Sequence, residues 1–343
     1  MKTVLVTGGT GYIGSHTAVE LIQRGFRVMI ADNLSNSREE VVDAIEKITG
    51  KRPAFFPLDL CDREKTNDFV TSHRPDAVIH FAAFKAVGES VEQPLKYYRN
   101  NLLSLIHILE AFLGIKGAHF LFSSSCSVYG QCDKLPITED TPLHKTESPY
   151  GNTKQISEEI LADTARVNPL LQAIALRYFN PAGAHESGWI GEYPLNPPSN
   201  LVPVITQTAA GKRSSLTVYG NNYATSDGTC IRDYIHVVDI AKAHVAALER
   251  LLQKKNKKNY EVYNLGTGKG NTVMEAIHAF EKVTGVKVNY EIGNRREGDV
   301  EKVWADTTLA NKELGWKSEL SLEDIMQSAW NWEMTLKAME KSN

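Results

Sequence analysis

The sequence predicts an α/β fold, in which a doubly wound parallel sheet is followed by a smaller, mixed α/β domain. Over the first 180 residues, short apolar runs typical of buried strands alternate with longer segments whose apolar residues recur at helical spacing. After Pro181 the chain becomes rich in proline, glycine and asparagine. We therefore expect a larger domain over residues 1–180 and a smaller one over residues 181–343, with the site in the cleft between them. The amphipathic stretch 233–252 is compatible with packing back on the larger domain.

Composition and charge exclude several classes of protein. Apolar residues make up 42% and charged residues 23% of the 343, the balance of an ordinary globular protein. The net charge is −3 and no long basic block is present, which argues against a nucleic-acid partner. The apolar runs are too short for a membrane span or a signal peptide, so we expect a cytoplasmic protein with no membrane partner. The four cysteines and ten histidines show no metal-binding or disulfide pattern, so no metal is predicted.

A glycine-rich turn joins the first predicted strand to the first predicted helix. Residues 4–6 form the unbroken apolar run of a parallel strand buried on both faces, and Gly8, Gly11 and Gly14 follow at GxxGxxG spacing. Glycines let the backbone approach a pyrophosphate, whose charge the N-terminus of the helix stabilises. Asp32 ends the second strand, where a carboxylate accepts hydrogen bonds from an adenosine ribose and repels the extra phosphate of NADP. This segment predicts a Rossmann-like domain that binds NAD.

The GxxGxxG spacing resembles that of the extended short-chain dehydrogenase/reductase family. In that family "LDL" at residues 58–60 would end a third strand near the adenine, and "VIHFAA" at residues 78–83 would end beside the cofactor phosphates. The resemblance implies that residues 1–180 are the NAD-binding domain. The residues that it implies for NAD binding are Gly8, Gly11, Tyr12, Ile13, Gly14, Asp32, Asn33, Asn36, Ser37, Asp59, Leu60, Phe81, Ala82, Ala83, Lys85, Asn100, Ser123, Tyr150, Lys154 and Tyr178.

The stretch "SPYGNTK" at residues 148–154 begins a predicted helix with a tyrosine and a lysine one turn apart. Ser148 suits the N-cap and Pro149 the first helical position, so Tyr150 and Lys154 project from the same side. An ammonium close to a phenol favours the phenolate, so we expect Lys154 to lower the pKa of Tyr150. Taken alone, however, the pair is better explained as an exposed helical contact.

A second stretch, "HFLFSSSCSVYG" at residues 119–130, changes that balance. It begins as a buried strand and ends in three serines, and open parallel sheets place their chemistry at the carboxyl ends of strands. The family resemblance then implies a catalytic triad of Ser125, Tyr150 and Lys154. In these roles Ser125 bonds the reacting hydroxyl, Tyr150 moves its proton, and Lys154 holds the cofactor ribose and tunes Tyr150.

The two residues after Ser125 narrow the choice of reaction. Nucleotide-sugar 4,6-dehydratases resemble this segment but place an Asp–Glu pair where this chain has Cys126 and Ser127, and they need that pair to eliminate water. Nucleotide-sugar decarboxylases typically keep a glutamate at the position of Ser127. With neither carboxylate present, the sequence predicts reversible oxidation of a hydroxyl without elimination.

Segments along the remaining chain resemble the UDP-glucose 4-epimerase family almost end to end, from Thr3 to about Trp332. They include "KAVGES", "RYFNPAGAH", "PSNLVP", "DGTCIRDYIHV", "YNLGTG" and "RREGD". The resemblance implies reversible C4 epimerisation of a UDP-hexose through a 4-keto sugar, with tightly held NAD and a UDP-sugar-binding domain over residues 181–343. The implied substrate-binding residues are Ser125, Tyr150, Asn180, Asn200, Leu201, Thr217, Tyr219, Arg232, Arg296, Asp299 and Val303.

Two further expectations rest on the same resemblance. The family residue that matches Val303 lies near the sugar 2-substituent, where a tyrosine restricts the pocket, so valine predicts that UDP-N-acetylhexosamines are also accepted. The family also implies a homodimer joined through the helices around residues 101–113 and 150–163. Apolar Leu102, Leu105, Ile106 and Leu109 at helical spacing suit such an interface, but they equally suit packing on their own sheet.

Three alternatives remain at this point. Another nucleotide-sugar enzyme, such as a UDP-glucuronate 4-epimerase, would use the same triad. A non-catalytic NAD sensor would need the glycine turn but would have no use for Ser125, Tyr150 and Lys154 together. "GTGKGNT" at residues 266–272 faintly resembles a phosphate-binding loop, but it lacks GxxxxGK[ST] and therefore argues only weakly for a nucleoside triphosphate.

Overall fold

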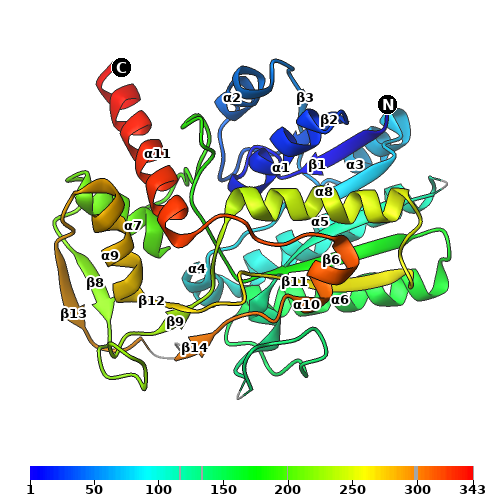
Figure 1. The fold of residues 1–343 in the computed structure, drawn as a ribbon. Helices are drawn as coiled ribbons and strands as arrows, with labels where there is room; N and C mark the ends of the chain where they lie inside the picture. Colours follow the sequence, from blue (N-terminus) through cyan, green and yellow to red (C-terminus); the bar gives the residue numbers. More distant parts are fainter. Residues whose placement is uncertain (116, 133, 199, 297–299, 343) are drawn as a thin grey trace.

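A seven-stranded parallel sheet forms the centre of the computed structural model, which describes residues 1–115, 117–132, 134–198, 200–296 and 300–342 (Figure 1). The strand order is β11-β6-β5-β4-β1-β2-β3, so the direction of winding reverses between β1 and β4. The predicted doubly wound parallel sheet is confirmed. The strands are β1 (Thr3–Thr7), β2 (Arg27–Asp32), β3 (Ala54–Pro57), β4 (Ala77–His80), β5 (His119–Ser125), β6 (Gln172–Tyr178) and β11 (Tyr260–Leu265).

Helices cover both faces of this sheet. Apolar residues of alternate strand positions pack on α1 (Tyr12–Gln23), α2 (Glu40–Thr49), α8 (Val237–Leu252) and α10 (Thr308–Leu314) on one face. On the other face they pack on α3 (Arg63–His73), α5 (Pro94–Leu113) and α6 (Pro149–Val167). Two short helices, α4 (Val87–Glu92) and the 3-10 turn η1 (Cys126–Tyr129), follow β4 and β5.

The rest of the chain forms a smaller layer with its own apolar core (Figure 1). Its helices are α7 (Leu201–Ala209), α9 (Val273–Thr284) and α11 (Leu322–Ser342). Its strands pair in three small sheets: β8 (Leu216–Tyr219) with β13 (Tyr290–Gly293), β7 (Asn180–Ala182) with β10 (Tyr234–His236), and β9 (Ile231–Arg232) between β12 (Asn271–Thr272) and β14 (Lys302–Val303). Two-residue strands of this kind position single side chains without building an extended sheet.

The larger layer does not stop at residue 180. Helix α8 packs along α1, with Ile240, Ala243 and Ala247 in the same apolar core as Ala18 and Leu21. Strand β11 then adds a seventh strand beside β6. The chain therefore crosses between the two layers more than once, which ties the smaller layer to the sheet.

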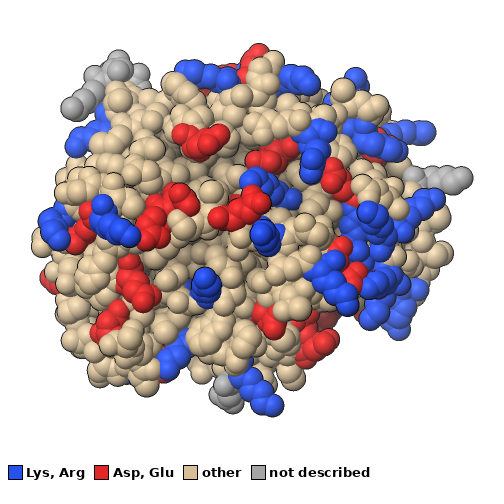
Figure 2. Space-filling model, in the orientation of Figure 1, with Lys and Arg blue, Asp and Glu red and all other residues tan. Residues whose placement is uncertain are grey.

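Both acidic and basic side chains lie on the visible face of the molecule, and basic side chains gather at its right side (Figure 2). Figure 2 shows acidic and basic side chains interspersed on this face, in keeping with the net charge of −3. Within the part of the chain that the structure describes, no helix has the length and apolarity needed to cross a membrane.

Candidate active site

A cavity of about 800 Å³ lies where the carboxyl ends of the parallel strands face the smaller layer. Of the residues predicted above to bind NAD or substrate, all those that the structure describes line this cavity except Val303. Asp299 lies outside the described residues. Open α/β sheets place their ligands at this edge, where the strand order reverses. Chemistry-bearing residues that are far apart in the sequence therefore share one cavity.

The glycine turn brings backbone, not side chains, to the cavity wall. Gly8 has φ +68°, and a Cβ there would lie 2.7 Å from the backbone nitrogen of Ala82. A Cβ on Gly14 would collide with the carbonyl oxygen of Gly8. No side chain caps the N-terminus of α1, so its first N–H groups are directed to the cavity without a competing side-chain acceptor. This cradle fits a pyrophosphate.

Asp32 is held in place at the end of β2. One carboxylate oxygen accepts from the backbone N–H of Thr10 at 3.2 Å, and the other accepts from the N–H of Leu34 at 2.9 Å and the hydroxyl of Ser37 at 3.1 Å. The side chain still lines the cavity. A fixed carboxylate at this position suits a ribose with free hydroxyls and opposes a phosphorylated one.

Tyr150 lies at the start of α6 and is buried beside Ser125. Burial raises the pKa of its phenol to about 12, and the hydrogen bond to Ser125 opposes that rise. Lys154, which the sequence predicts to lower the pKa of Tyr150, is not among the groups that shift it here. The Lys154 ammonium lies 6.0 Å from the centre of the Tyr150 ring and is bonded elsewhere.

That other partner of Lys154 is the strand that carries Ser125. The Lys154 Nζ atom donates to the carbonyl oxygen of Ser123 at 2.6 Å and lies 4.8 Å from the ring centre of Phe122. Burial lowers the pKa of Lys154 to about 7, and the negative charge of Glu158 opposes this effect. The lysine therefore joins α6 to the end of β5.

The turn after Ser125 holds no carboxylate. Ser127 donates both its backbone N–H (3.2 Å) and its hydroxyl (3.0 Å) to the Ser125 Oγ atom. The Cys126 thiol points to the carbonyl oxygen of Phe179 at 3.9 Å, and burial raises its pKa to about 12. Among the described lining residues, the carboxylates are Asp32, Asp59 and Glu192. The cavity thus offers a tyrosine for proton transfer at this point, without an acid–base pair for elimination.

Polar groups from the smaller layer face the triad. The Asn180 Oδ1 atom is buried and has no hydrogen-bond partner among the described residues, which marks it as an acceptor that a ligand hydroxyl would satisfy. Arg232, on β9, lines the same wall. Further out, the Arg296 guanidinium stacks on the Tyr219 ring, 3.9 Å from its centre. Arginine forks and a flat aromatic ring are groups that suit a diphosphate and a base.

Comparison with known proteins agrees with this geometry. A family model described as GDP-mannose 4,6 dehydratase matches residues 5–329. The UDP-glucose 4-epimerase of Erwinia amylovora is 49% identical over 331 residues, which is 96% of this chain and 97% of the relative. The chain belongs to the UDP-glucose 4-epimerase family.

Solved structures of the UDP-glucose 4-epimerase family share the whole fold. The enzyme of Stenotrophomonas maltophila, crystallised with NAD and formylated UDP-arabinopyranose, is 46% identical with a TM-score of 0.94, and all of both chains is covered. The enzyme of Bifidobacterium longum, in complex with NAD⁺ and UDP, is 45% identical with a TM-score of 0.92 and covers 97% of this chain and 98% of its own. The UDP-Glc/GlcNAc 4-epimerase of Campylobacter jejuni is 37% identical with a TM-score of 0.84, and it covers 98% of this chain and 100% of its own.

Sequence reasoning missed Glu192 in this member of the UDP-glucose 4-epimerase family. Its Oε1 atom accepts from Lys85 Nζ and from Asn200 Nδ2, both at 2.8 Å, so one carboxylate joins a predicted NAD residue to a predicted substrate residue. A single glutamate within a loop carries no pattern that would reveal this. His244 is also fully buried and bonds the Tyr178 hydroxyl at 2.7 Å.

Two other sequence features lie away from the cavity. Val303 packs beside Val128, Phe179 and Cys126 in an apolar cluster one layer behind the wall, although its strand pairs with that of Arg232. The loop "GTGKGNT" surrounds an internal carboxylate: Asp233 accepts from the Thr267 N–H at 2.8 Å and from the Gly268 N–H at 3.2 Å. The resemblance to a phosphate loop has this physical basis, because an aspartate of the chain fills the anion position.

Proposed function

We propose that this chain catalyses the NAD-dependent, reversible C4 epimerisation of UDP-glucose and UDP-galactose through a 4-keto sugar. The observation that carries the proposal is the single cavity in which Ser125, Tyr150 and Lys154 lie between the glycine turn and the wall formed by Asn180 and Arg232. The family relationship and the nucleotide sugars found in related structures support the same substrate class.

NAD fits the cofactor half of the cavity. Gly8 and Gly14 would present the pyrophosphate with backbone and helix N-terminus, Asp32 would accept from the adenosine ribose, and Lys154 would hold the other ribose. Reversible uptake of a hydride, with a positive charge beside Tyr150, is the chemistry that NAD supplies when it is bound.

Side chains of the protein carry out the proton transfers. Tyr150, as the phenolate, accepts the proton of the sugar 4-hydroxyl as C4 is oxidised. Before substrate binds, the hydrogen bond between Ser125 and Tyr150 opposes the rise in the pKa of Tyr150; with substrate bound, the Ser125 hydroxyl would hold the reacting oxygen instead. The same Tyr150 returns the proton when C4 is reduced from the opposite face of the sugar. Cys126 and Ser127 offer no base for removing a second proton, so the ketone is reduced again and water is not eliminated.

The direct test is to incubate purified protein with UDP-galactose, without added cofactor, and to measure UDP-glucose. We expect conversion, because NAD is regenerated in each cycle and held by the protein. A second arm with UDP-galacturonate separates the alternative nucleotide-sugar epimerase: faster turnover of that substrate would replace the proposed one. NAD-loaded protein that converts neither sugar would reject an enzymatic role and favour an NAD sensor.

We also propose that UDP-N-acetylhexosamines are accepted. A valine at position 303 is smaller than the tyrosine that restricts the pocket in this family, and a 37%-identical neighbour is named for both UDP-Glc and UDP-GlcNAc. Val303 would act from behind the cavity wall, through the cluster that includes Cys126. Turnover of UDP-N-acetylgalactosamine by the wild type, lost in Val303→Tyr while UDP-galactose turnover persists, is the expected result. Wild-type protein without that turnover would refute it.

We also propose a homodimer that is joined through α5 and α6. Leu105 and Leu109 are buried on their own sheet, but Leu95 is 79% exposed and Leu103 36% exposed on the outer side of α5. A second copy of the chain would cover them. Light scattering should give a dimer that Leu95→Glu dissociates, whereas Ile292→Glu, an equally apolar exposed position in the smaller layer, should leave it intact. A monomeric wild type would contradict the proposal.

We propose a cytoplasmic location as well. Cys61 and Cys126 are free thiols, the state that reducing compartments maintain. Fractionation of the native host with a cytoplasmic marker would test it, and recovery outside that fraction would reject it.

A further inference from the structure

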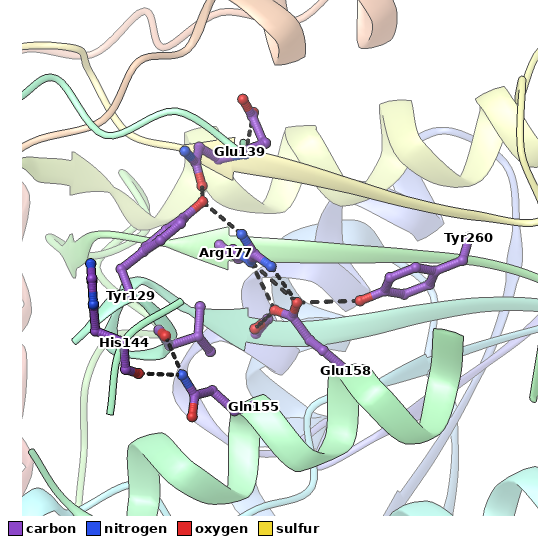
Figure 3. Close-up of polar contacts among 10 residues, drawn as sticks. Tyr129, Glu139, His144, Gln155, Glu158, Arg177 and Tyr260 are labelled. Carbon is purple, nitrogen blue, oxygen red and sulfur yellow. Dashed lines mark hydrogen bonds and ion pairs between the residues drawn. The ribbon is translucent and has the colours of Figure 1, made fainter. Parts of the chain in front are cut away.

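A buried ion pair lies directly behind the catalytic groups. Glu158 follows Lys154 by one turn of α6, and its side chain is 5% exposed. Arg177, near the end of β6, donates to it through Nε (2.9 and 3.2 Å) and through Nη2 (2.6 Å), which is a bidentate pair (Figure 3). Neither residue lines the cavity. The pair is therefore available neither to substrate nor to cofactor.

Two hydroxyl groups complete the shell of the Glu158 carboxylate. The Ser124 hydroxyl, on β5, donates to Oε1, and the Tyr260 hydroxyl, at the start of β11, donates to Oε2 at 3.3 Å. Arg177 in turn donates to the Tyr129 hydroxyl at 2.8 Å, in the turn that follows Ser125 (Figure 3). One helical residue is thus bonded to three neighbouring strands of the sheet.

These contacts meet the strand that carries Ser125 at two consecutive residues. Lys154 binds the carbonyl oxygen of Ser123, and Glu158 binds the hydroxyl of Ser124. Because Lys154 and Glu158 are one turn apart on α6, the two bonds together set how far the end of β5 is displaced along the helix axis. Ser125 comes next on the strand, and Tyr150 lies one turn earlier on the helix.

Simple stabilisation explains this arrangement poorly. Taking two charges out of water costs about as much as their pairing returns, and apolar residues of similar volume often serve stability equally well. The negative charge of Glu158 also raises the pKa of Lys154 against the effect of burial. Both the contacts and the charge of Glu158 are thus directed toward the catalytic pair.

We propose that Glu158 is a positioning residue that, through Ser124 and Arg177, sets the end of β5 against α6 so that Ser125 and Tyr150 hold the sugar 4-hydroxyl together. The inference rests on the proposed epimerase function. It predicts that loosening the Ser124 contact lowers the rate of the chemical step while leaving substrate binding intact.

Ser124→Ala and Tyr260→Phe form a matched pair for the test. Each removes one hydroxyl that donates to the same carboxylate, and each leaves the Glu158–Arg177 pair in place. Only Ser124 adjoins a catalytic residue. Glu158→Gln is less informative, because it leaves the Arg177 guanidinium buried without a counter-charge and invites unfolding.

The measurement is steady-state turnover of UDP-galactose together with melting temperature and bound NAD. Ser124→Ala should lower kcat by about 10- to 100-fold with KM nearly unchanged, since small misplacements of reacting groups cost that much. Tyr260→Phe should keep kcat within about twofold of wild type. Both variants should lose a similar, small amount of melting temperature, about 2 °C.

The outcomes separate the two claims. Equal kcat values for Ser124→Ala and Tyr260→Phe, with active wild type, would overturn the positioning role and leave the proposed function standing. A wild type that does not convert UDP-galactose would overturn both. A kcat loss confined to Ser124→Ala, at equal melting temperature and NAD content, supports the proposal.

Discussion

The two halves of the cavity are built in different ways. In the cofactor half, the groups that face the ligand are backbone amides, or side chains already held by neighbours, as Asp32 is by Thr10 and Ser37. In the nucleotide-sugar half, Tyr219 is 38% exposed and has the Arg296 guanidinium stacked on it. The first half rests on a seven-stranded sheet, the second on short strands and loops.

This difference in rigidity agrees with the different roles that the two halves have in the proposed reaction. Groups that are already fixed lose little freedom on binding, so they favour a cofactor that stays through many cycles. Exposed side chains on short strands can rearrange as a substrate enters and leaves. The 4-keto sugar must also rotate between oxidation and reduction, so that its opposite face is presented to the cofactor. This suits a site that binds the UDP firmly and leaves the hexose room to move.

The largest loss of activity is expected at Tyr150, where the two halves of the cavity meet. Tyr150→Phe removes the group that moves the 4-hydroxyl proton, and kcat should fall by about 10³-fold, within the range for loss of a general acid–base. Melting temperature and bound NAD should stay close to wild type, because the ring remains in its buried place. Near-normal turnover would show that another group moves the proton.

The next largest effect is expected from a substitution in the glycine turn of the cofactor half. Gly14→Ala drives a Cβ into the carbonyl of Gly8, so the free energy of unfolding should drop by about 1–3 kcal/mol and NAD should be lost on purification. Gly88→Ala is the control, since a Cβ there meets no atom within 4 Å and helical alanine is favourable. If Gly14→Ala retains NAD as Gly88→Ala does, the backbone contact at Gly14 is not required for NAD binding.

In the nucleotide-sugar half, the effects of substituting two adjacent arginines can be compared. Arg296 lines the cavity, whereas Arg295 donates to Asn222 at 2.7 Å and stacks on Tyr223. Arg296→Ala should raise KM for the UDP-sugar by about tenfold, the value of a charge-assisted bond, and leave melting temperature and NAD unchanged. Arg295→Ala should change KM less. A larger KM effect for Arg295 would place the nucleotide elsewhere.

Low pH should lower the free energy of unfolding, because histidines buried in the larger layer are uncharged in the folded protein. Burial lowers the pKa of His16 and His80 to about 3 and that of His244 to about 4. Below pH ~6.5 the unfolded chain binds protons that the folded chain does not, so the free energy of unfolding falls by about 1.4 kcal/mol per pH unit for each histidine. Urea unfolding at pH 7 and pH 5.5 should show this loss, and His16→Asn should reduce it. An unchanged pH dependence in His16→Asn would contradict the assignment.

The features that sequence predicted are those that short stretches of chain determine. Gly8 and Gly14 lie within one turn and helix start, and Tyr150 and Lys154 are one turn apart, so spacing alone relates them. Asp32 follows from the end of a strand whose apolar character is visible in the sequence. Each of these residues lies at the cavity, as expected.

What sequence could not predict depends on distant partners. The Lys154 ammonium is bonded to Ser123, 31 positions away, so its distance from the Tyr150 ring could not be read from the helix. Glu192 gains its role from Lys85, 107 positions away. The loop after β11 has the composition of a phosphate site, and only the fold reveals that Asp233 fills it.

The central claim is that hydrogen leaves C4 of the sugar as a hydride and returns to the same carbon within one cavity. Conversion of UDP-galactose in deuterium oxide, followed by NMR of the product, tests this most directly. The account predicts UDP-glucose that retains hydrogen at C4, because a hydride held in the cavity does not exchange with solvent. Deuterium at C4 would contradict the account, since it would mean that a proton, not a hydride, leaves that carbon.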